Sequence, residues 1–352
     1  EAAFVGGIAG YNLGKIEMQE DVSVALVGKN FVGGIAGGNA PGGVIENTAT
    51  ATTEGKTAFS ISGSITGRLA VGGVVGYNCG NTLPGAVKFT GTMQGYRFVG
   101  GIVGANLPAV NGDKTFAFSE DGKPAVSGVG TISGDAAVGG VIGFNQLVAA
   151  GTYTQRQADT TLASYCESLL PTFAAADATA EDGILRENSA AATGTNAGIT
   201  LTGLSNSVGI NANAYAGGMI GYNAETTTLA LKECTNNGNI TCPYAVDADG
   251  ETATLKEGVS VAEYLKNRGY THNGAAYWQE DDVKAHFLGG IIGVNTQKTT
   301  LEHCTNKGSI SGTANAVGGL TGLNEGAIKD CTNEANLVTG VQHYIGGIAG
   351  VN

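Results

Sequence analysis

The amino-acid sequence predicts an all-β protein, a parallel β-helix (β-solenoid) with coils of roughly 27–39 residues and two inserted loop or helix elements. Three observations predict this fold class. Glycine supplies 59 of the 352 residues, more than twice its usual share of about 7%. A seven-residue motif, G-G-x-x-G-x-N, recurs nine times and contains 27 of those glycines. Hydrophobic residues make up 42% of the chain, which, with only 6 prolines and no G-X-Y period, excludes collagen-like and disordered chains.

The recurring motif sets the length of one coil. Its copies begin at Gly6, Gly33, Gly72, Gly100, Gly139, Gly217, Gly289, Gly318 and Gly346. The intervals are 27, 39, 28, 39, 78, 72, 29 and 28 residues, and all but two are in the range of solenoid repeats. Short β-branched runs punctuated by Gly and Asn predict brief strands joined by tight turns. We therefore expect successive circuits of the chain to stack about 4.8 Å apart.

Each fixed position of the motif has an architectural reason. Three representative copies contain Gly6, Gly7, Gly10 and Asn12; Gly139, Gly140, Gly143 and Asn145; and Gly318, Gly319, Gly322 and Asn324. A Gly pair permits either a bend with positive φ or a close approach of two backbones. Stacked Asn side chains can hydrogen-bond along the axis. The apolar residues on either side of the Gly pair are three positions apart. Either the chain bends there and both point inward, or the strand is covered on both faces.

The residue before the motif Asn alternates in size over the first five copies. It is Tyr11, Gly38, Tyr77, Ala105 and Phe144 in turn. Interdigitating side chains in a two-coil unit would produce this pattern. A binding groove formed by the small members is the alternative.

A second pattern lies between the motif copies and indicates another strand of the coil. It contains Cys234, Cys304 and Cys331, each followed by Thr-Asn, and we also assign Glu46-Asn47-Thr48 and Glu187-Asn188-Ser189 to it. The three cysteines at equivalent positions predict a buried ladder. His303 shares its place with Glu233 and Asp330, which indicates a solvated turn position and not a metal ligand.

Two insertions divide the predicted solenoid. We assign residues 1–145, 184–242 and 287–352 to one continuous solenoid, 146–183 to a helical insertion and 243–286 to an aromatic-rich insertion with a short helix. In the first insertion, Asp159 is a candidate N-cap and Pro171 ends an apolar run at helical spacing. In the second, Ser260 and Glu263 form a capping box.

The second insertion holds the candidate ligand-binding residues. These are Tyr244, Tyr264, Tyr270, Tyr277 and the only tryptophan, Trp278. An exposed cluster of such rings could stack on sugars or anchor a protein partner, and the alternative is that they form the insertion's own small core. Asp247, Asp249 and Glu251 resemble the opening of a calcium loop, with a plain acidic turn as the alternative. Beyond that calcium ion we expect no cofactor.

Composition and motifs exclude several other functions. A net charge of −12 and only 18 basic residues argue against nucleic-acid binding. The four histidines do not form H-E-x-x-H, and the six cysteines include no C-x-x-C pair, which argues against a zinc site. No apolar stretch is long enough to predict a membrane span. We name no catalytic residue.

The repeat carries a resemblance to a known family. The phrase V-G-G-[IL]-x-G-x-N, alternating with x-C-T-N-x-G-x-[IV]-x-G as from Cys304 to Asn324, resembles the GLUG-motif repeat of large secreted and cell-surface bacterial proteins. The resemblance covers about four fifths of the chain, outside the two insertions. It implies an exported repeat region with a β-solenoid fold and an adhesin-like or stalk-like role, and it transfers no catalytic residue.

These observations together predict a non-enzymatic, extracellular structural or adhesive module, a rigid stalk or filament segment of a bacterial surface protein. The chain begins and ends inside a repeat, so we expect either axial self-association or a longer parent chain. Two alternatives stay open. One is a polysaccharide-active β-helix lyase or hydrolase using acid pairs such as Glu181-Asp182. The other is an adhesin that binds a glycan or host protein through residues 243–286.

Overall fold

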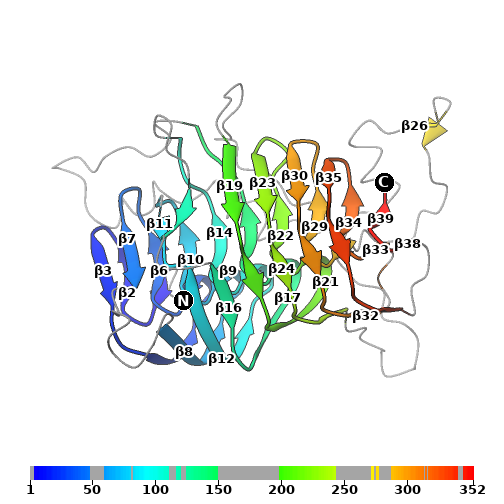
Figure 1. Ribbon diagram of the computed structural model, residues 1–352. Coiled ribbons are helices and arrows are strands. Elements are labelled where there is room, and N and C mark those ends of the chain that lie inside the picture. Colours follow the sequence, from blue (N-terminus) through cyan, green and yellow to red (C-terminus); the bar gives the residue numbers. More distant parts are fainter. Residues whose placement is uncertain are drawn as a thin grey trace.

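The structure is a computed structural model, and it describes residues 4–47, 59–80, 82–110, 116–119, 124–149, 198–242, 271–272, 275–276, 287–312, 314, 316–339 and 344–352. Within these residues every regular element is a strand, and every strand pairing is parallel except that between β26 (Thr271–His272) and β27 (Ala275–Ala276). The strands wind into coils that stack along one axis, from blue at the left of Figure 1 to red at the right. The predicted fold class, a parallel β-helix, is confirmed.

One coil shows how the sequence makes the turn of the solenoid. β9 (Leu69–Gly72) leads into β10 (Val75–Asn78), followed by β11 (Thr82–Leu83) and β12 (Ala86–Gln94). β13 (Arg97–Gly100) then pairs with β9 and begins the next coil. Each coil therefore uses one copy of the glycine motif to form its first corner.

The second half of the motif forms one continuous nine-stranded parallel sheet. Its strands are β2 (Ala9–Asn12), β6 (Ala36–Asn39), β10, β14 (Val103–Asn106), β18 (Ile142–Asn145), β22 (Ile220–Asn223), β29 (Ile292–Asn295), β34 (Thr321–Asn324) and β39 (Ala349–Val351). β18 pairs with β22 and β22 with β29, so motif copies 78 and 72 residues apart lie on adjacent coils. The two long intervals each contain one coil plus inserted sequence.

The first half of the motif lies in a 20-stranded sheet that also holds the last side of each coil. The strands before the Gly pair are β1 (Val5–Gly6), β5 (Asn30–Gly33), β9, β13, β17 (Gly130–Gly139), β21 (Gly209–Gly217), β28 (Phe287–Gly289), β33 (Ala316–Gly318) and β38 (Tyr344–Gly346). The others are β4 (Val22–Val27), β8 (Phe59–Thr66), β12, β16 (Ala125–Ser127), β20 (Ser205–Asn206), β24 (Thr235–Asn236), β25 (Ile240–Cys242), β31 (Thr305–Asn306), β32 (Ile310–Gly312), β36 (Thr332–Asn333) and β37 (Leu337–Thr339).

Two four-stranded sheets close the remaining side. One contains β3 (Lys15–Met18), β7 (Val44–Asn47), β11 and β15 (Ala117–Phe118), and the other β19 (Gly198–Thr202), β23 (Thr228–Lys232), β30 (Thr299–Glu302) and β35 (Ala327–Lys329). Asn47 pairs with Met18 in this side of the solenoid. Our assignment of Glu46-Asn47-Thr48 to the Cys-Thr-Asn pattern was therefore wrong, because β7 occupies a different side of the coil from β24.

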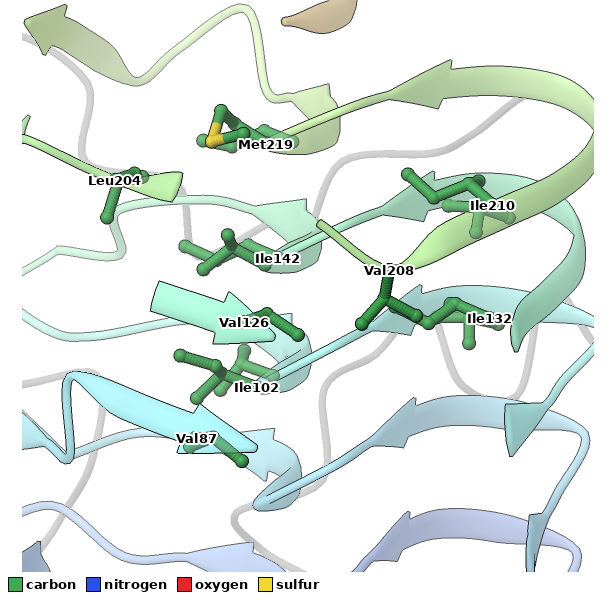
Figure 2. Close-up of a cluster of buried hydrophobic side chains, with 14 of the residues drawn as sticks. Val87, Ile102, Val126, Ile132, Ile142, Leu204, Val208, Ile210 and Met219 are labelled. Carbon is green, nitrogen blue, oxygen red and sulfur yellow. The ribbon is translucent and has the colours of Figure 1, made fainter. Parts of the chain in front are cut away.

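The chain bends at the glycine pair, and the residues flanking the pair both point inward. Val71 and Val74 are fully buried in the same core cluster, and a two-residue bend separates β9 from β10. Figure 2 shows this core, where Ile102, Ile142 and Met219 of three stacked motifs face Val87, Val126 and Leu204 across the interior. The first of our two alternatives for the flanking residues is therefore observed. The second is observed as well, because Ala70 and Tyr77 on the other face of β9 and β10 are fully buried in a second cluster.

Aromatic rings form a second buried cluster beside this core. Phe31, Phe98 and Tyr215 have φ of 52°, 58° and 52°, values that L-residues rarely adopt, and the rings enter the cluster with Tyr77 and Phe144. Ring centroids lie 5.3 Å apart for Phe31 and Tyr77 and 4.9 Å apart for Phe98 and Phe144.

Large and small residues alternate in this cluster in compensating order. In the second to fifth motif copies, a ring two residues before the Gly pair accompanies a small residue before the Asn (Phe31 with Gly38, Phe98 with Ala105), and the other two copies pair Ala70 with Tyr77 and Ala137 with Phe144. The first and sixth copies have rings at both positions, where Phe4 contacts Tyr11 and Tyr215 contacts Tyr222. A Cβ added at Gly38 would lie less than 3.0 Å from ring atoms of Tyr11. The size alternation is therefore close packing, and the groove alternative is wrong at Gly38.

Candidate functional site: the ladders and exposed coils of the solenoid

The motif asparagines form a hydrogen-bonded ladder inside the solenoid. From the first motif copy to the fifth, the amide Nδ2 donates to the Oδ1 of the next copy, at 2.8 Å from Asn12 to Asn39, 2.9 Å from Asn39 to Asn78, 2.7 Å from Asn78 to Asn106, 2.9 Å from Asn106 to Asn145 and 2.8 Å from Asn145 to Asn223. The inner members are fully buried. A second hydrogen bond ties Asn12, Asn39, Asn78 and Asn223 to the turn that follows each of them, as where Asn78 Nδ2 also donates to the carbonyl of Gly80 at 2.9 Å. Buried amides satisfied in this way hold adjacent coils in one register.

The motif glycines make this register sterically possible. At Gly139 and Gly318, a Cβ would lie less than 3.0 Å from the carbonyl oxygen three residues ahead, and at Gly140 and Gly319 from a carbonyl of the next coil. The positive φ values of the described glycines occur elsewhere, as at Gly63. Close approach of backbones, and not positive φ, is thus the reason for the Gly pair.

The third motif glycine brings two sides of the coil together. A Cβ at Gly143 or Gly322 would lie less than 3.0 Å from a backbone nitrogen of the strand beneath, whereas at Gly10 in the first coil the nearest atom is 3.4 Å away. The first Gly pair, Gly6 and Gly7, has the same close contacts as its later counterparts.

A second asparagine ladder runs through the later coils, which the sequence analysis missed. Asn206 donates to Asn236 at 3.1 Å, Asn236 to Asn306 at 2.9 Å and Asn306 to Asn333 at 3.1 Å. Each of these residues also closes a turn, since the Oδ1 of Asn206 accepts the N–H of Val208 at 3.1 Å. The constant Asn of the Cys-Thr-Asn pattern was the available signal.

The predicted cysteine row lies at the corner before this ladder. Cys234 and Cys304 are buried, Cys331 is half-buried, and all three are free thiols. Each thiol donates to the carbonyl two residues earlier, at 3.3 Å to Lys232, 3.5 Å to Glu302 and 3.1 Å to Lys329. The preceding residues Glu233, His303 and Asp330 are exposed and have φ of 54°, 53° and 48°. The same carbonyls also accept a backbone N–H from a neighbouring coil, as where Gly203 donates to Lys232 at 2.8 Å and Glu233 to Glu302 at 2.9 Å. Each thiol is therefore a second donor at its left-handed corner.

Charged side chains pair in rows on the outer face of the four-stranded sheets. The ammonium group of Lys15 lies 2.6 Å from carboxylate oxygens of Glu17 and Glu46, and these hydrogen bonds raise the pKa of Lys15. Lys232 lies 2.9 Å from Glu302, which raises the pKa of the lysine and lowers that of the carboxyl. These pairs are solvent-exposed, so they contribute little to stability individually.

Another outward row carries no charge along most of the solenoid. Register pairs place Thr66, Gln94, Ser133, Asn211, Thr241 and Ser311 in line on successive coils. One of these two outward rows thus offers paired charges and the other neutral polar groups. Among the described residues no set of three or more His, Cys, Asp or Glu side chains is arranged to hold a metal ion.

The first and last coils expose residues that are buried elsewhere. Ile8 is 53% exposed and Ile348 41% exposed, whereas their counterparts Ile35 and Leu320 are fully buried. The apolar interior is therefore open at both ends of the described stack.

Several predicted site residues lie outside the described residues. They are the aromatic residues Tyr244, Tyr264, Tyr270, Tyr277 and Trp278, and the calcium candidates Asp247, Asp249 and Glu251. The helix predicted to begin near Asp159, the helix near Ser260 and the acid pair Glu181-Asp182 also lie outside them. In the part of the chain that is described, no helix is long and apolar enough to cross a membrane.

The fold and its ladders define a β-solenoid repeat protein. Comparisons with protein-family models, with curated proteins and with solved structures found no match. The resemblance to the GLUG-motif repeat stays a prediction from the motifs.

Proposed function

We propose that this chain is a non-enzymatic structural or adhesive module, a rigid stalk or filament segment of a secreted or cell-surface bacterial protein. The observation that supports this proposal best is the asparagine ladder, which links successive coils by buried hydrogen bonds from Asn12 to Asn223. Because each coil contacts only its neighbours, such a ladder favours a stack that resists bending and shear.

Rigidity is a property that a stalk needs and a flexible linker lacks. The glycines that would make a linker flexible are here packed against backbone, and the aromatic cluster fills the space beside them. Length then scales with the number of coils at about 4.8 Å each. Further coils, from the same chain or from a second copy, would cover the exposed Ile8 and Ile348.

Single-molecule force spectroscopy tests the stalk proposal directly. The chain is held by tags at its two termini and pulled, and we expect a stiff body that yields in steps, one or a few coils at a time. Asn106→Ala should lower the force of a step, whereas Asn352→Ala at the exposed last rung serves as the matched control. A chain that extends smoothly at low force, as a flexible linker does, would refute the proposal.

The enzymatic alternative has its own test. The chain is screened for cleavage of polysaccharides, beside a variant in which Glu181, Asp182 and the acidic run 280–282 are replaced by alanine. Turnover by the unmodified chain that is lost in this variant would replace the stalk proposal with a polysaccharide-active enzyme.

The adhesive alternative concerns the second insertion. Removing residues 244–286 should leave the solenoid's circular dichroism unchanged. Loss of attachment to a glycan or host-protein array in that deletion would assign adhesion to the insertion, and unchanged attachment would exclude it from that role.

A further inference from the structure

Three thiols stand in a row along the solenoid axis, on three successive coils. Cys234, Cys304 and Cys331 immediately precede β24, β31 and β36, whose threonines are paired in register. The backbone N–H of Cys304 donates to the Sγ of Cys331 at 3.2 Å, and the Cys304 thiol donates to the carbonyl of Leu231, one coil earlier, at 3.4 Å. Each sulfur therefore lies close to the neighbouring coil.

The spacing of the row suits a covalent bond between neighbours and excludes a shared metal ion. Paired positions on adjacent parallel strands are about 4.8 Å apart, within the Cα separation of about 4.4–6.8 Å that a disulfide requires. The two outer thiols are two coil steps apart, about 10 Å, so the three cannot converge on one ion. The described residues accordingly contain no metal-binding group at this corner.

We propose that Cys304 and Cys331 form a modification site that closes to a disulfide in the presence of a small-molecule disulfide such as oxidised glutathione. Cys331 is the half-buried member of the row, whereas Cys234 and Cys304 are fully buried, so an oxidant reaches Cys331 first. The bond would join the coil of β36 to that of β31 and close a loop of 27 residues.

The reaction proceeds in two exchange steps. The Cys331 thiol loses its proton to solvent, and its sulfur attacks one sulfur of oxidised glutathione, whose S–S bond breaks and releases one reduced glutathione. The Cys304 sulfur, after losing its proton, attacks the Cys331 sulfur of this mixed disulfide and releases the second reduced glutathione. The two protein thiols give up two electrons, and the glutathione disulfide accepts them.

The environment of the row makes this reaction slow at neutral pH. The hydrogen bond with the Cys234 thiol raises the pKa of Cys304 to about 12, and the hydrogen bond with Cys304 raises the pKa of Cys331. Because the thiolate is the attacking species, the rate should rise about tenfold per pH unit between about pH 7 and pH 9.

Peptide mapping tests the proposal on the full chain. The reduced, folded protein is incubated with oxidised glutathione at about pH 8.5, remaining thiols are alkylated, and the chain is digested with trypsin. Cleavage after Lys298, Lys307 and Lys329 places Cys304 in peptide 299–307 and Cys331 in peptide 330–352, while Cys234 and Cys242 share peptide 233–256. We expect a linked product of 299–307 and 330–352, lighter than the two free peptides together by two hydrogens, about 2 Da.

Variants separate this bond from other pairings. Cys331→Ser should abolish the linked product, and Cys242→Ser, at a buried position on another side of the coil, should leave it intact. The time course on the unmodified protein needs no variant and keeps the test valid if a variant fails to fold. Alkylated thiols on both peptides, glutathione retained on Cys331, or a link to peptide 233–256 would each overturn the proposal.

Discussion

Replacing one inner rung of the asparagine ladder should destabilise the solenoid by an amount that its hydrogen bonds determine. Asn106 is fully buried, accepts a hydrogen bond from Asn78 at 2.7 Å and donates one to Asn145 at 2.9 Å. Asn106→Ala leaves a buried donor on one side and a buried acceptor on the other. At about 1–3 kcal/mol for each unsatisfied group, the loss is about 2–6 kcal/mol.

The loss should also be local, because the coils interact only with their neighbours. Hydrogen exchange followed by mass spectrometry should show faster exchange in β10, β14 and β18 and unchanged exchange in β34. Urea denaturation followed by circular dichroism gives the free energy of unfolding. Asn352→Ala is the matched control, since this Asn is exposed, and it should change stability by no more than about 0.5 kcal/mol.

Asn106→Asp should make the free energy of unfolding depend on pH, and the burial of the new carboxyl determines the sign of this dependence. A buried carboxyl has a pKa raised above its unfolded value of about 3.9, so the native state binds the proton more tightly than the unfolded chain. The variant should therefore be most stable below that unfolded pKa and should lose stability as the pH rises through the raised pKa. An Asn106→Ala variant as stable as Asn352→Ala, or an Asp variant with no pH dependence, would refute the role of the ladder.

Three further predictions concern glycine contacts, ring packing and a surface ion pair. Gly76→Ala should cost more than about 2 kcal/mol, because the new Cβ meets backbone of the preceding coil, while Gly14→Ala, with no atom within 4 Å, should be nearly neutral in urea denaturation. Ala105→Phe should cost about 1–3 kcal/mol by overpacking the aromatic cluster, and adding Phe98→Ala should recover part of it in thermal melts; no recovery would contradict size compensation. The hydrogen bond with Lys232 lowers the pKa of Glu302. The ionised carboxylate therefore contributes to the stability of the folded state at neutral pH, and this contribution is lost as the pH falls through the lowered pKa. Glu302→Gln should thus differ slightly from the unmodified chain at pH 7 and not in acid.

Sequence reasoning was able to predict the features that repeat at fixed spacing. The glycine motif determined the strand-and-turn unit, and the alternation from Tyr11 to Phe144 predicted interdigitating side chains, now seen as compensation with residues such as Phe31 and Phe98. Both predictions use short-range sequence patterns. Such patterns are sufficient to predict the structure of a coil when its neighbouring coils have the same pattern.

Features that depend on which strands meet could not be predicted in this way. The left-handed backbone at Phe31 is unfavourable for an aromatic residue in isolation, and it persists because the ring is buried among neighbours from adjacent coils. The Glu-Asn sequence that ends at Asn47 resembles the Cys-Thr-Asn pattern, which also ends in an Asn. Asn47 nevertheless pairs with Met18, on a different side of the coil from β24. The local sequence could not distinguish the side of the coil that contains β7 from the side that contains β24. The connections that precede these two strands differ in length, four residues before β7 and two before β24.

The side-chain hydrogen bonds that join adjacent coils change position at the second insertion. Asn223 donates to the hydroxyl of Thr299 at 3.1 Å and not to Asn295, whose Oδ1 has no hydrogen-bond partner among the described residues. The first ladder is therefore interrupted between β22 and β29, although β22 and β29 remain paired.

The same two coils are also joined at and beside the Cys-Thr-Asn corner. Asn236 donates to Asn306, the Cys304 thiol donates to the carbonyl of Leu231, and Lys232 pairs with Glu302. Two of these three links are buried hydrogen bonds, so they compensate for the missing rung more effectively than the exposed ion pair does. A single ladder serves the early coils, whereas the coils around the insertion depend on the Cys-Thr-Asn corner. Loss of Asn236 should consequently weaken the junction between the β23–β25 coil and its successor, where the first ladder is interrupted.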